Sequence, residues 1–296
     1  MRRDGDKAKD FAQRHRVPKW YSDADQLIND PEINAIYIAT PPDSHEVYTI
    51  KAAKADKPVY VEKPMARTYT ECVSMVEACQ KSNVPLFTAY YRRSLSNILK
   101  IKSLLQEKAI GEIRYVSITL NKTIQPDIVG ASKRNNNWRV DPEVAGGGYF
   151  FDLASHQLDI LDFLFGPIKE AHGFATNQAN TYKAEDIVVG SYCFENGILG
   201  QGNWCFTTSA ISSKELITIV GSNGQISFGC FGDHSVTLEV EGKEKQVMMF
   251  DIPKHIQQPL IQTIVDELLG KGECLSTGVS GARTSKVMEL LCRRIR

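Results

Sequence analysis

The sequence predicts an α/β fold in two parts: a parallel-sheet domain over residues 1–92, then an α+β domain with a large, mostly antiparallel open sheet over residues 93–296. In the first part, short apolar β-runs alternate with helical periods, which is typical of βαβ units. From Ile168 to about Phe250, about six strand-like segments are separated by turn signals such as Glu195-Asn196-Gly197. The domain boundary is expected near Arg92, where the alternation of short strands and helices ends.

The first part is expected to alternate helices and strands. Thr68 and Glu71 form a capping box, which predicts the start of the helix that ends at Lys81. The expected elements are a helix at Asp6–His15, an extended piece at Lys19–Tyr21, a small helix after Asp23, a strand at Ala35–Ala39, a helix at His45–Ala55, a strand at Val59–Glu62, the capped helix, and a strand at Leu86–Tyr90.

The second part begins with a helix and an extended run and closes with two helices. A polar loop carries Trp138 and Arg139, and a glycine triplet introduces the helix that contains Asp152 and His156. The expected elements outside the strand-rich region are a helix at Ser94–Lys108, an extended run at Ile113–Leu120, and helices at Gln257–Leu269 and Gly278–Ile295.

The composition narrows the class of protein. The 35 basic and 35 acidic residues give no net charge, so a nucleic-acid or anionic-membrane partner has no electrostatic support. The seven cysteines are scattered and never spaced as C-x-x-C, which favours reduced thiols in the cytoplasm over a disulfide framework or a zinc site. No run of eighteen apolar residues occurs, so no membrane partner is expected.

The stretch Val59–Pro64 delivers a lysine to the end of a predicted strand. Its apolar residues indicate a buried strand, and Pro64 ends it directly after Glu62 and Lys63. In open α/β sheets, ligands bind beyond the carboxyl ends of the strands, so Lys63 is predicted to face a binding crevice. A single Glu-Lys-Pro motif is more often an ordinary strand end.

Asp152 and His156 are spaced to share one helix face. The carboxylate is therefore expected to hydrogen-bond the imidazole, fix its tautomer and raise its basicity. Asp159 lies on the same face. Such pairs are more often surface or capping interactions, and this spacing alone leaves both interpretations open.

Five motifs together resemble one family. They are Thr40-Pro41-Pro42 with His45, Glu62-Lys63-Pro64, Trp138-Arg139, Gly146-Gly147-Gly148, and Asp152-x-x-x-His156-x-x-Asp159. In this order and spacing they resemble the Gfo/Idh/MocA oxidoreductases. Ser276-Thr277-Gly278 with Arg283-Thr284-Ser285 is similar to the tail of that family. The resemblance spans nearly the whole chain.

The resemblance implies an NAD(P)-dependent oxidoreductase that acts on a sugar, cyclitol or related polyol. His156 would exchange the hydroxyl proton, Lys63 would hydrogen-bond the reacting oxygen, and Asp152 would orient His156 or Lys63. The cofactor would contact Thr40, Pro41, His45, Glu62, Lys63, Trp138 and Arg139. The substrate would contact Lys63, Tyr91, Arg92, Arg139, Asp152 and His156. No metal is implied, and the second sheet would form a homo-oligomer, a dimer or a tetramer.

The sequence departs from the family at the cofactor site, because it contains no G-x-G-x-x-G motif. The first domain is expected to be an N-terminally incomplete Rossmann-type sheet, starting roughly 30 residues late by the size of a βα unit. Arg2 and Arg3 would then take the place of the acidic residue that binds the ribose of NAD, which favours NADP over NAD. The first domain is therefore expected to fold poorly or to bind dinucleotide weakly.

Two alternatives stay open at this point. One is a catalytically impaired structural relative, for which the missing glycine loop is the main argument. The other is an NAD-dependent glycosidase of the same fold, which would keep its cofactor bound and release a free sugar. Tyr91, Arg92, Trp138 and Arg139 would in either case also suit packing at the domain junction.

Overall fold

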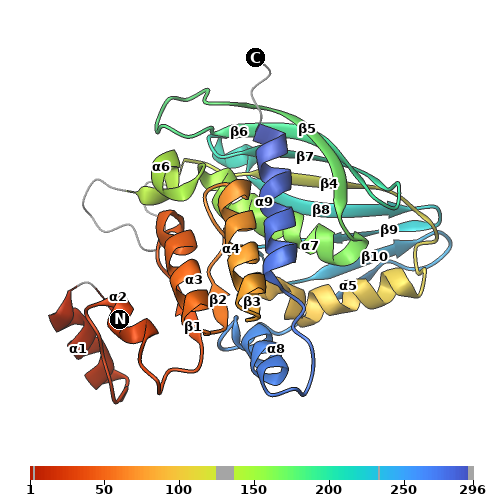
Figure 1. Cartoon of the computed structure of the whole chain (residues 1–296). Coiled ribbons are helices and arrows are strands. Elements are labelled where there is room, and N and C mark those ends of the chain that lie inside the picture. Colours follow the sequence, from red (N-terminus) through yellow and green to blue (C-terminus); the bar gives the residue numbers. More distant parts are fainter. Residues whose placement is uncertain (3, 125–136, 233, 293–296) are drawn as a thin grey trace.

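The computed structural model describes residues 1–2, 4–124, 137–232 and 234–292 (Figure 1). Its described residues form a three-stranded parallel sheet, in the order β1-β2-β3, and an eight-stranded sheet, in the order β11-β10-β9-β8-β4-β7-β6-β5. The α/β class and the predicted order of a parallel sheet followed by a larger, mostly antiparallel sheet are confirmed.

The first sheet is built by residues up to Thr88. Its elements are α1 (Gly5–Arg14), α2 (Ala24–Ile28), β1 (Ile36–Ile38), the 3₁₀ turn η1 (Pro42–Ser44), α3 (His45–Lys54), β2 (Val59–Val61), α4 (Tyr69–Lys81) and β3 (Leu86–Thr88). The expected extended piece at Lys19–Tyr21 contains no helix or strand and lies outside both described sheets.

Two local sequence signals explain the strand and helix that flank Lys63. All three residues of β2 are buried, as expected of a central parallel strand that is covered on both faces. At the start of α4, Thr68 Oγ1 accepts a hydrogen bond of 3.1 Å from the backbone N–H of Glu71. The Glu71 carboxylate in turn accepts the backbone N–H of Arg67 at 2.9 Å. The capping box thus fixes the chain between β2 and α4.

The second sheet carries most of the hydrophobic core. β4 pairs in parallel with β7 and antiparallel with β8, so the sheet is mixed. Its strands are β4 (Ile113–Asn121), β5 (Ile168–Thr176), β6 (Ile187–Phe194), β7 (Leu199–Cys205), β8 (Lys214–Gly221), β9 (Gly224–Phe228), β10 (Val236–Val240) and β11 (Gln246–Met248).

Helices cover one face of this sheet, as Figure 1 shows for α5, α7 and α9. The remaining elements are η2 (Tyr91–Ser94), α5 (Ser96–Gln106), η3 (Trp138–Val140), α6 (Pro142–Ala145), the π-helical segment η4 (Phe150–Ala154), α7 (Ser155–Phe165), η5 (Ala210–Ser212), α8 (Gln258–Leu268) and α9 (Gly278–Cys292). Trp204 is fully buried between β7 and α7, where its indole Nε1–H donates to Gln157 Oε1 at 2.8 Å.

The C-terminal helix α9 packs against both layers, with α4 and β3 on one side and β5 and α7 on the other. Close approach depends on two glycines: a Cβ on Gly281 would lie 2.4 Å from Thr88 Oγ1, and one on Gly173 would lie 2.4 Å from the carbonyl oxygen of Leu291. Just before α9, Ser276 extends the edge of β3, because its Oγ donates to the carbonyl of Thr88 at 2.7 Å. The end of the chain therefore joins the two sheets.

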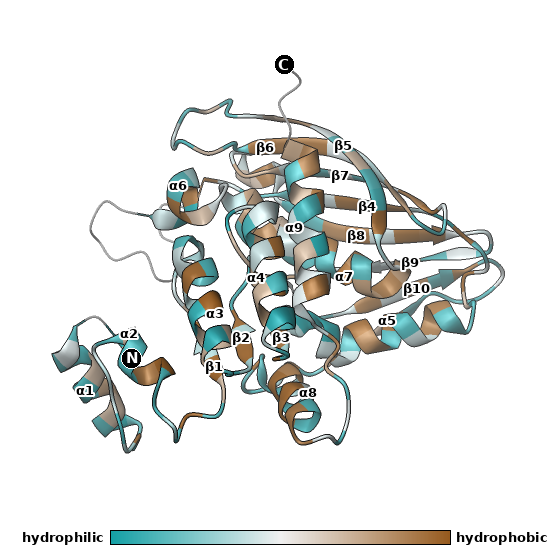
Figure 2. Cartoon of the chain, in the orientation of Figure 1, coloured by the Kyte–Doolittle hydropathy of each residue, from teal (hydrophilic) through white to brown (hydrophobic). Residues whose placement is uncertain are grey.

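Hydropathy follows this layered arrangement. In Figure 2, α3, α4 and α8 each carry hydrophilic residues beside hydrophobic ones. Within the part of the chain that the structure describes, no helix is long and apolar enough to cross a lipid bilayer.

Candidate functional site

Lys63 lies just beyond the carboxyl end of β2, where the first sheet meets the second domain. Its Nζ donates to Oδ1 of Asp152 at 2.6 Å and to the Asp152 carbonyl oxygen at 2.9 Å. The Lys63–Pro64 peptide bond is cis. The two side chains are only 16% and 18% exposed, so the ion pair is largely withdrawn from water. The structure thus brings together two residues, one from each domain, that are 89 positions apart in the sequence.

Asp152 lies in η4, at the start of the helix that carries His156. Its second carboxylate oxygen is 3.6 Å from Nε of Arg139, so it sits between two cations. The expected hydrogen bond from Asp152 to His156 is not formed. A full positive charge on Lys63 offers the carboxylate a stronger partner than a neutral imidazole does, which explains the difference.

His156 is 4% exposed and lies among aromatic rings. Its ring centroid is 5.4 Å from that of Tyr91 and 5.9 Å from that of Phe231, both edge to face. Its Nδ1 has no hydrogen-bond partner among the described residues. Burial, and then the charges of Lys63 and Arg92, hold the pKa of His156 well below its usual value. The imidazole is therefore neutral at pH 7 and able to accept a proton.

Glu62 joins the ends of the first sheet to α8. Its Oε1 accepts the Tyr37 hydroxyl at 2.6 Å and Nε2 of Gln257 at 2.9 Å. Its Oε2 accepts the backbone N–H of Lys63 at 3.1 Å. These bonds fix the backbone of Lys63 directly. The predicted contact of Glu62 with a cofactor stays a prediction.

His45 is fully buried at the start of α3. Its ring nitrogens lie 3.1 Å from the carbonyl oxygen of Met65 and 2.8 Å from that of Thr40. Burial lowers the pKa of His45, although the two carbonyls favour its protonated form. The ring ties the loop after β1 to the loop after β2, and its predicted contact with a cofactor stays a prediction.

A cavity of about 830 Å³ opens at the carboxyl end of β1. It brings Arg2 together with Thr40, Pro41 and Ser44, and Ser44 Oγ lies 2.8 Å from Thr40 Oγ1. Its volume is within the range of small-molecule sites. Most of its lining is apolar, and its polar groups are one arginine, two carboxylates and several hydroxyls, of which the arginine and the hydroxyls suit a nucleotide. Arg3, the other predicted cofactor residue of this region, lies outside the described residues.

Trp138 and Arg139 form η3 beside the Lys63–Asp152 pair. The guanidinium of Arg139 lies 4.4 Å from the centroid of the Trp138 ring. The side chain of Asn137 accepts the backbone N–H of Arg139 at 3.3 Å and donates to the Tyr149 hydroxyl at 2.8 Å. Arg139 is thereby held beside Asp152, and its predicted contacts with cofactor and substrate stay predictions.

A buried ion cluster below the site was not foreseen from the sequence. Arg93 donates from Nε and Nη2 to the two carboxylate oxygens of Asp159 at 2.9 and 2.7 Å. Its Nη2 also reaches Asp162 at 3.1 Å, and Arg283 of α9 makes two bonds of 2.8 Å to Asp162. Burial raises the pKa of Asp159 to about 6, and the charge of Arg93 opposes this rise. The cluster fixes η2 and α7, which carry Arg92 and His156.

Phe231 is a second feature that the sequence did not indicate. Glu215 of β8 accepts the backbone N–H groups of Cys230 at 2.7 Å and of Phe231 at 3.2 Å. It also accepts Nε2 of Gln157 at 3.0 Å. These bonds hold the Phe231 ring against His156 and Arg92. No local motif marks this loop, because its position depends on a strand far from it in the chain.

The described residues contain no group of three or more histidine, cysteine or acidic side chains arranged to hold a metal ion. All seven cysteines are free thiols. A parallel sheet whose carboxyl edge meets a mixed-sheet domain beside a buried, neutral histidine is an arrangement that nucleotide-dependent oxidoreductases use.

Comparison with known proteins agrees with this class. The family model described as "Oxidoreductase family, NAD-binding Rossmann fold" matches residues 1–90, and the one described as "GFO/IDH/MocA C-terminal domain" matches residues 98–227. The chain belongs to the Gfo/Idh/MocA family of oxidoreductases. The resemblance seen in the sequence motifs is thereby confirmed.

The chain is similar to several named members of the family. "Oxidoreductase P35" of Formosa agariphila is 37% identical over 292 residues, which cover 99% of this chain and 88% of that protein. A 1,5-anhydro-D-fructose reductase of Ensifer adhaerens is 27% identical over 67% of this chain and 58% of its own length, less than two thirds of that relative. A solved structure of levoglucosan dehydrogenase, in complex with NADH and levoglucosan, has a TM-score of 0.85 at 20% identity, over 97% of this chain and 84% of that one. This last similarity supports the fold.

Proposed function

We propose that the chain transfers a hydride between NAD(P) and a hydroxyl-bearing carbon of a sugar, cyclitol or related polyol. The observation that carries the proposal is the convergence of the Lys63–Asp152 ion pair with the buried, neutral His156. Relatives named 1,5-anhydro-D-fructose reductase and myo-inositol 2-dehydrogenase support a polyhydroxylated substrate. The cofactor, when bound, supplies or accepts the hydride.

His156 is the proton acceptor in this proposal. During oxidation it takes the proton of the reacting hydroxyl, and during reduction it returns it. Its unpartnered Nδ1 is buried, and no described carboxylate bonds the ring, so the ring stays neutral until substrate arrives. The aromatic rings around it exclude water from the step.

Lys63 stabilises the negative charge that develops on the reacting oxygen. An ammonium group has three N–H donors, and the two bonds to Asp152 use two of them. The third is left for substrate, and the two bonds fix its direction. Asp152 therefore acts by orienting Lys63, with Arg139 holding its other oxygen.

Thr40, Pro41, His45, Glu62, Trp138 and Arg139 are proposed to form or support the cofactor site, with Tyr91, Arg92 and Arg139 at the substrate end. Arg2 at the mouth of the cavity supports NADP. NAD is the alternative, because solved neighbours are described in complex with NAD+ or NADH. We further propose a cytoplasmic location, which the free thiols support.

Hydride transfer is tested by following reduced nicotinamide in mixtures of the chain, NADP+ or NAD+, and a panel of sugars and cyclitols. We expect one polyol class to reduce the cofactor, with a higher kcat/KM for NADP+. Fluorescence titration with NADPH and NADH first establishes cofactor binding. Folded, cofactor-binding protein that reduces nothing would contradict the proposal. A free sugar released without net reduction would assign the glycosidase instead.

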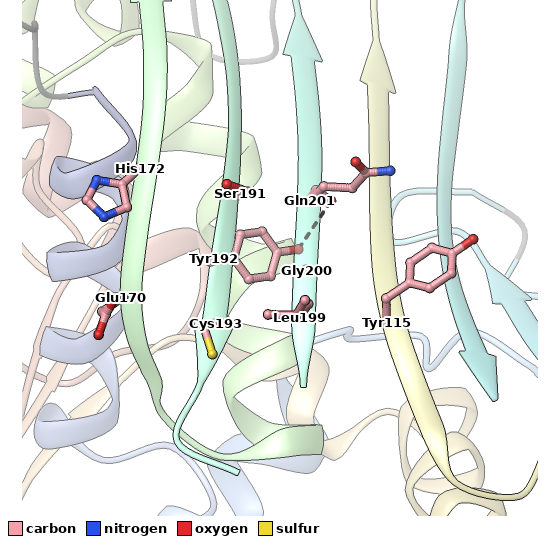
Figure 3. Close-up of a pocket in the computed structure, with 9 residues that line it drawn as sticks. All are labelled: Tyr115, Glu170, His172, Ser191, Tyr192, Cys193, Leu199, Gly200 and Gln201. Carbon is pink, nitrogen blue, oxygen red and sulfur yellow. Dashed lines mark hydrogen bonds between the residues drawn. The ribbon is translucent and has the colours of Figure 1, made fainter. Parts of the chain in front are cut away.

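We propose that the exposed face of the second sheet binds a second copy of the chain. Figure 3 shows side chains of β4, β5, β6 and β7 on this sheet, including Tyr115 and His172. Phe174 is 73% exposed and Leu199 59% exposed. Exposed apolar patches of this kind mark interfaces. The chain has no net charge, so two copies do not repel each other.

Light scattering after size exclusion tests this interface. The wild-type chain is expected to elute as a dimer or tetramer, and Phe174→Glu with Leu199→Lys as a monomer, because buried charges at the interface cost more than the contact returns. The matched control is Ile211→Glu, at a residue that is 97% exposed in η5. A monomeric wild type would contradict the proposal.

A further inference from the structure

Arg92 is a buried arginine to which the structure gives no carboxylate. It is 7% exposed, and its Nε has no hydrogen-bond partner among the described residues. No described acidic side chain forms an ion pair with it either. A buried charge is normally paired, because removing it from water is costly. The missing partner of Arg92 therefore needs an explanation.

The neighbouring arginine shows that the fold can supply partners at this depth. Arg93, in the same short helix η2, bonds both carboxylate oxygens of Asp159 and one of Asp162. Arg92 instead lies against two aromatic faces, 5.1 Å from the Tyr91 centroid and 4.8 Å from the Phe231 centroid. Such faces hold a guanidinium without neutralising it. The charge of Arg93 is thus neutralised within the fold, whereas the charge of Arg92 remains free to bind a ligand.

The acidic groups nearest this region are all engaged elsewhere. Asp152 is bonded to Lys63, and Asp159 to Arg93. Glu215 accepts backbone N–H groups of the Phe231 loop and the side-chain amide of Gln157. None of them is arranged to pair with Arg92 in the described structure.

A second cation lies on the same ring. The Nζ of Lys122, directly after β4, is 5.9 Å from the centroid of Phe231, and none of the ion pairs among the described residues includes it. The ring of Phe231 is also in edge contact with His156. The Phe231 ring therefore contacts two cations, Arg92 and Lys122, as well as His156, the residue that is proposed to exchange the substrate proton.

We propose that Arg92, assisted by Lys122, binds a carboxylate of the substrate, so that the chain acts on sugar acids such as uronic or aldonic acids rather than on neutral polyols. A guanidinium presents two parallel N–H groups that match the two oxygens of a carboxylate. The inference rests on the proposed function, because it names the substrate of the site that contains His156. In this arrangement the substrate carboxylate lies beside His156, which accepts the proton of the reacting hydroxyl, and Phe231 packs against the sugar ring.

Calorimetric titration of matched pairs tests this assignment in about 0.15 M salt, where surface charge is screened. The probes are D-glucuronate against D-glucose, D-galacturonate against D-galactose, and D-gluconate against D-glucitol, each with and without NADPH. At least one acid is expected to bind ten or more times more tightly than its neutral partner. Glucose 6-phosphate is included, and its tighter, Arg92-dependent binding would overturn the carboxylate in favour of a phosphate.

The Arg92→Gln variant is expected to lose about 10²-fold in affinity for the acid and less than threefold for the neutral sugar. Arg92→Lys should lie between, because it keeps the charge and loses the paired donors. Arg114→Gln, at an exposed arginine of β4, is the matched control. Equal losses for acid and neutral sugar, or no acid that binds more tightly than its partner, would overturn the proposal.

Stability separates a ligand-binding role from a structural one. Arg92→Gln removes a buried charge that has no partner, so its melting temperature should not fall. A fall of more than about 4 °C would assign Arg92 to the structure and overturn the proposal. The binding of an acid and the transfer of a hydride are measured separately, so each can fail without the other. Arg92-dependent binding of an acid without nicotinamide reduction would leave this inference standing and contradict the redox function, whereas Arg92-independent oxidation of neutral polyols would do the reverse.

Discussion

The His156→Asn variant is expected to lower kcat by about 10²- to 10⁴-fold, the usual contribution of a positioned acid–base group. The amide cannot accept the substrate proton at neutral pH, while it keeps much of the shape of the ring. Cofactor affinity should stay within about threefold, because binding and proton transfer are separate contributions. Stopped-flow measurement of nicotinamide reduction gives the rate of the step itself.

The matched control is His255→Asn, at an exposed histidine just before α8. It should leave kcat unchanged. A loss of less than about tenfold in His156→Asn would contradict its role as the proton acceptor.

The pH profile gives a second readout of the same residue. Burial, Lys63 and Arg92 lower the pKa of His156, and burial raises the pKa values of Tyr90 and Tyr91 that face it. The ring is thus competent as a base above its lowered pKa. In oxidation, kcat/KM should stay level as pH falls through the usual histidine pKa near 6.5 and decline only well below it, whereas an ordinary histidine would decline around that value.

The Arg93→Met variant should destabilise the chain by about 3 to 5 kcal/mol, because it leaves the carboxylates of Asp159 and Asp162 buried with one cation instead of two. Urea unfolding followed by tryptophan fluorescence measures this loss, since Trp204 is fully buried in the same core. The unfolding transition of the variant should therefore have a lower urea midpoint than that of the wild-type chain.

Two comparison variants show whether the pairing itself is responsible. Arg283→Met removes the outer, 39% exposed arginine of the cluster and should cost only about 1 kcal/mol. Adding Asp159→Leu to Arg93→Met should recover part of the loss, because Asp162, the carboxylate that remains, still pairs with Arg283. A loss below about 1 kcal/mol in Arg93→Met would mean that the cluster is not a stabilising element.

Local signals predicted most of the secondary structure. The β2 run, the capping box of Thr68 and Glu71, and the helix at Ser155–Phe165 all depend on residues close in sequence. The extended piece expected at Lys19–Tyr21 joins neither sheet, because a strand needs a neighbour and the local pattern cannot supply one.

The candidate site was predicted less completely than the fold. Asp152 was expected to orient either Lys63 or His156. It bonds Lys63, and the imidazole of His156 donates no hydrogen bond to it. Helical spacing predicts which residues share one face of a helix. It does not indicate that a charged residue from another domain, here Lys63, pairs with Asp152. Phe231 and Arg93 were missed for the same reason, because their contacts join segments far apart in the chain.

The position of α9 has a consequence for protein synthesis. Ser276 bonds the carbonyl of Thr88 across 188 residues of sequence, and α9 completes the cover over β3 and α4. While the ribosome is still translating, this side of the first sheet has nothing to pack against. The cover of the first sheet is therefore completed only after α9 has been synthesised, so we infer that nascent chains expose part of its apolar surface until then.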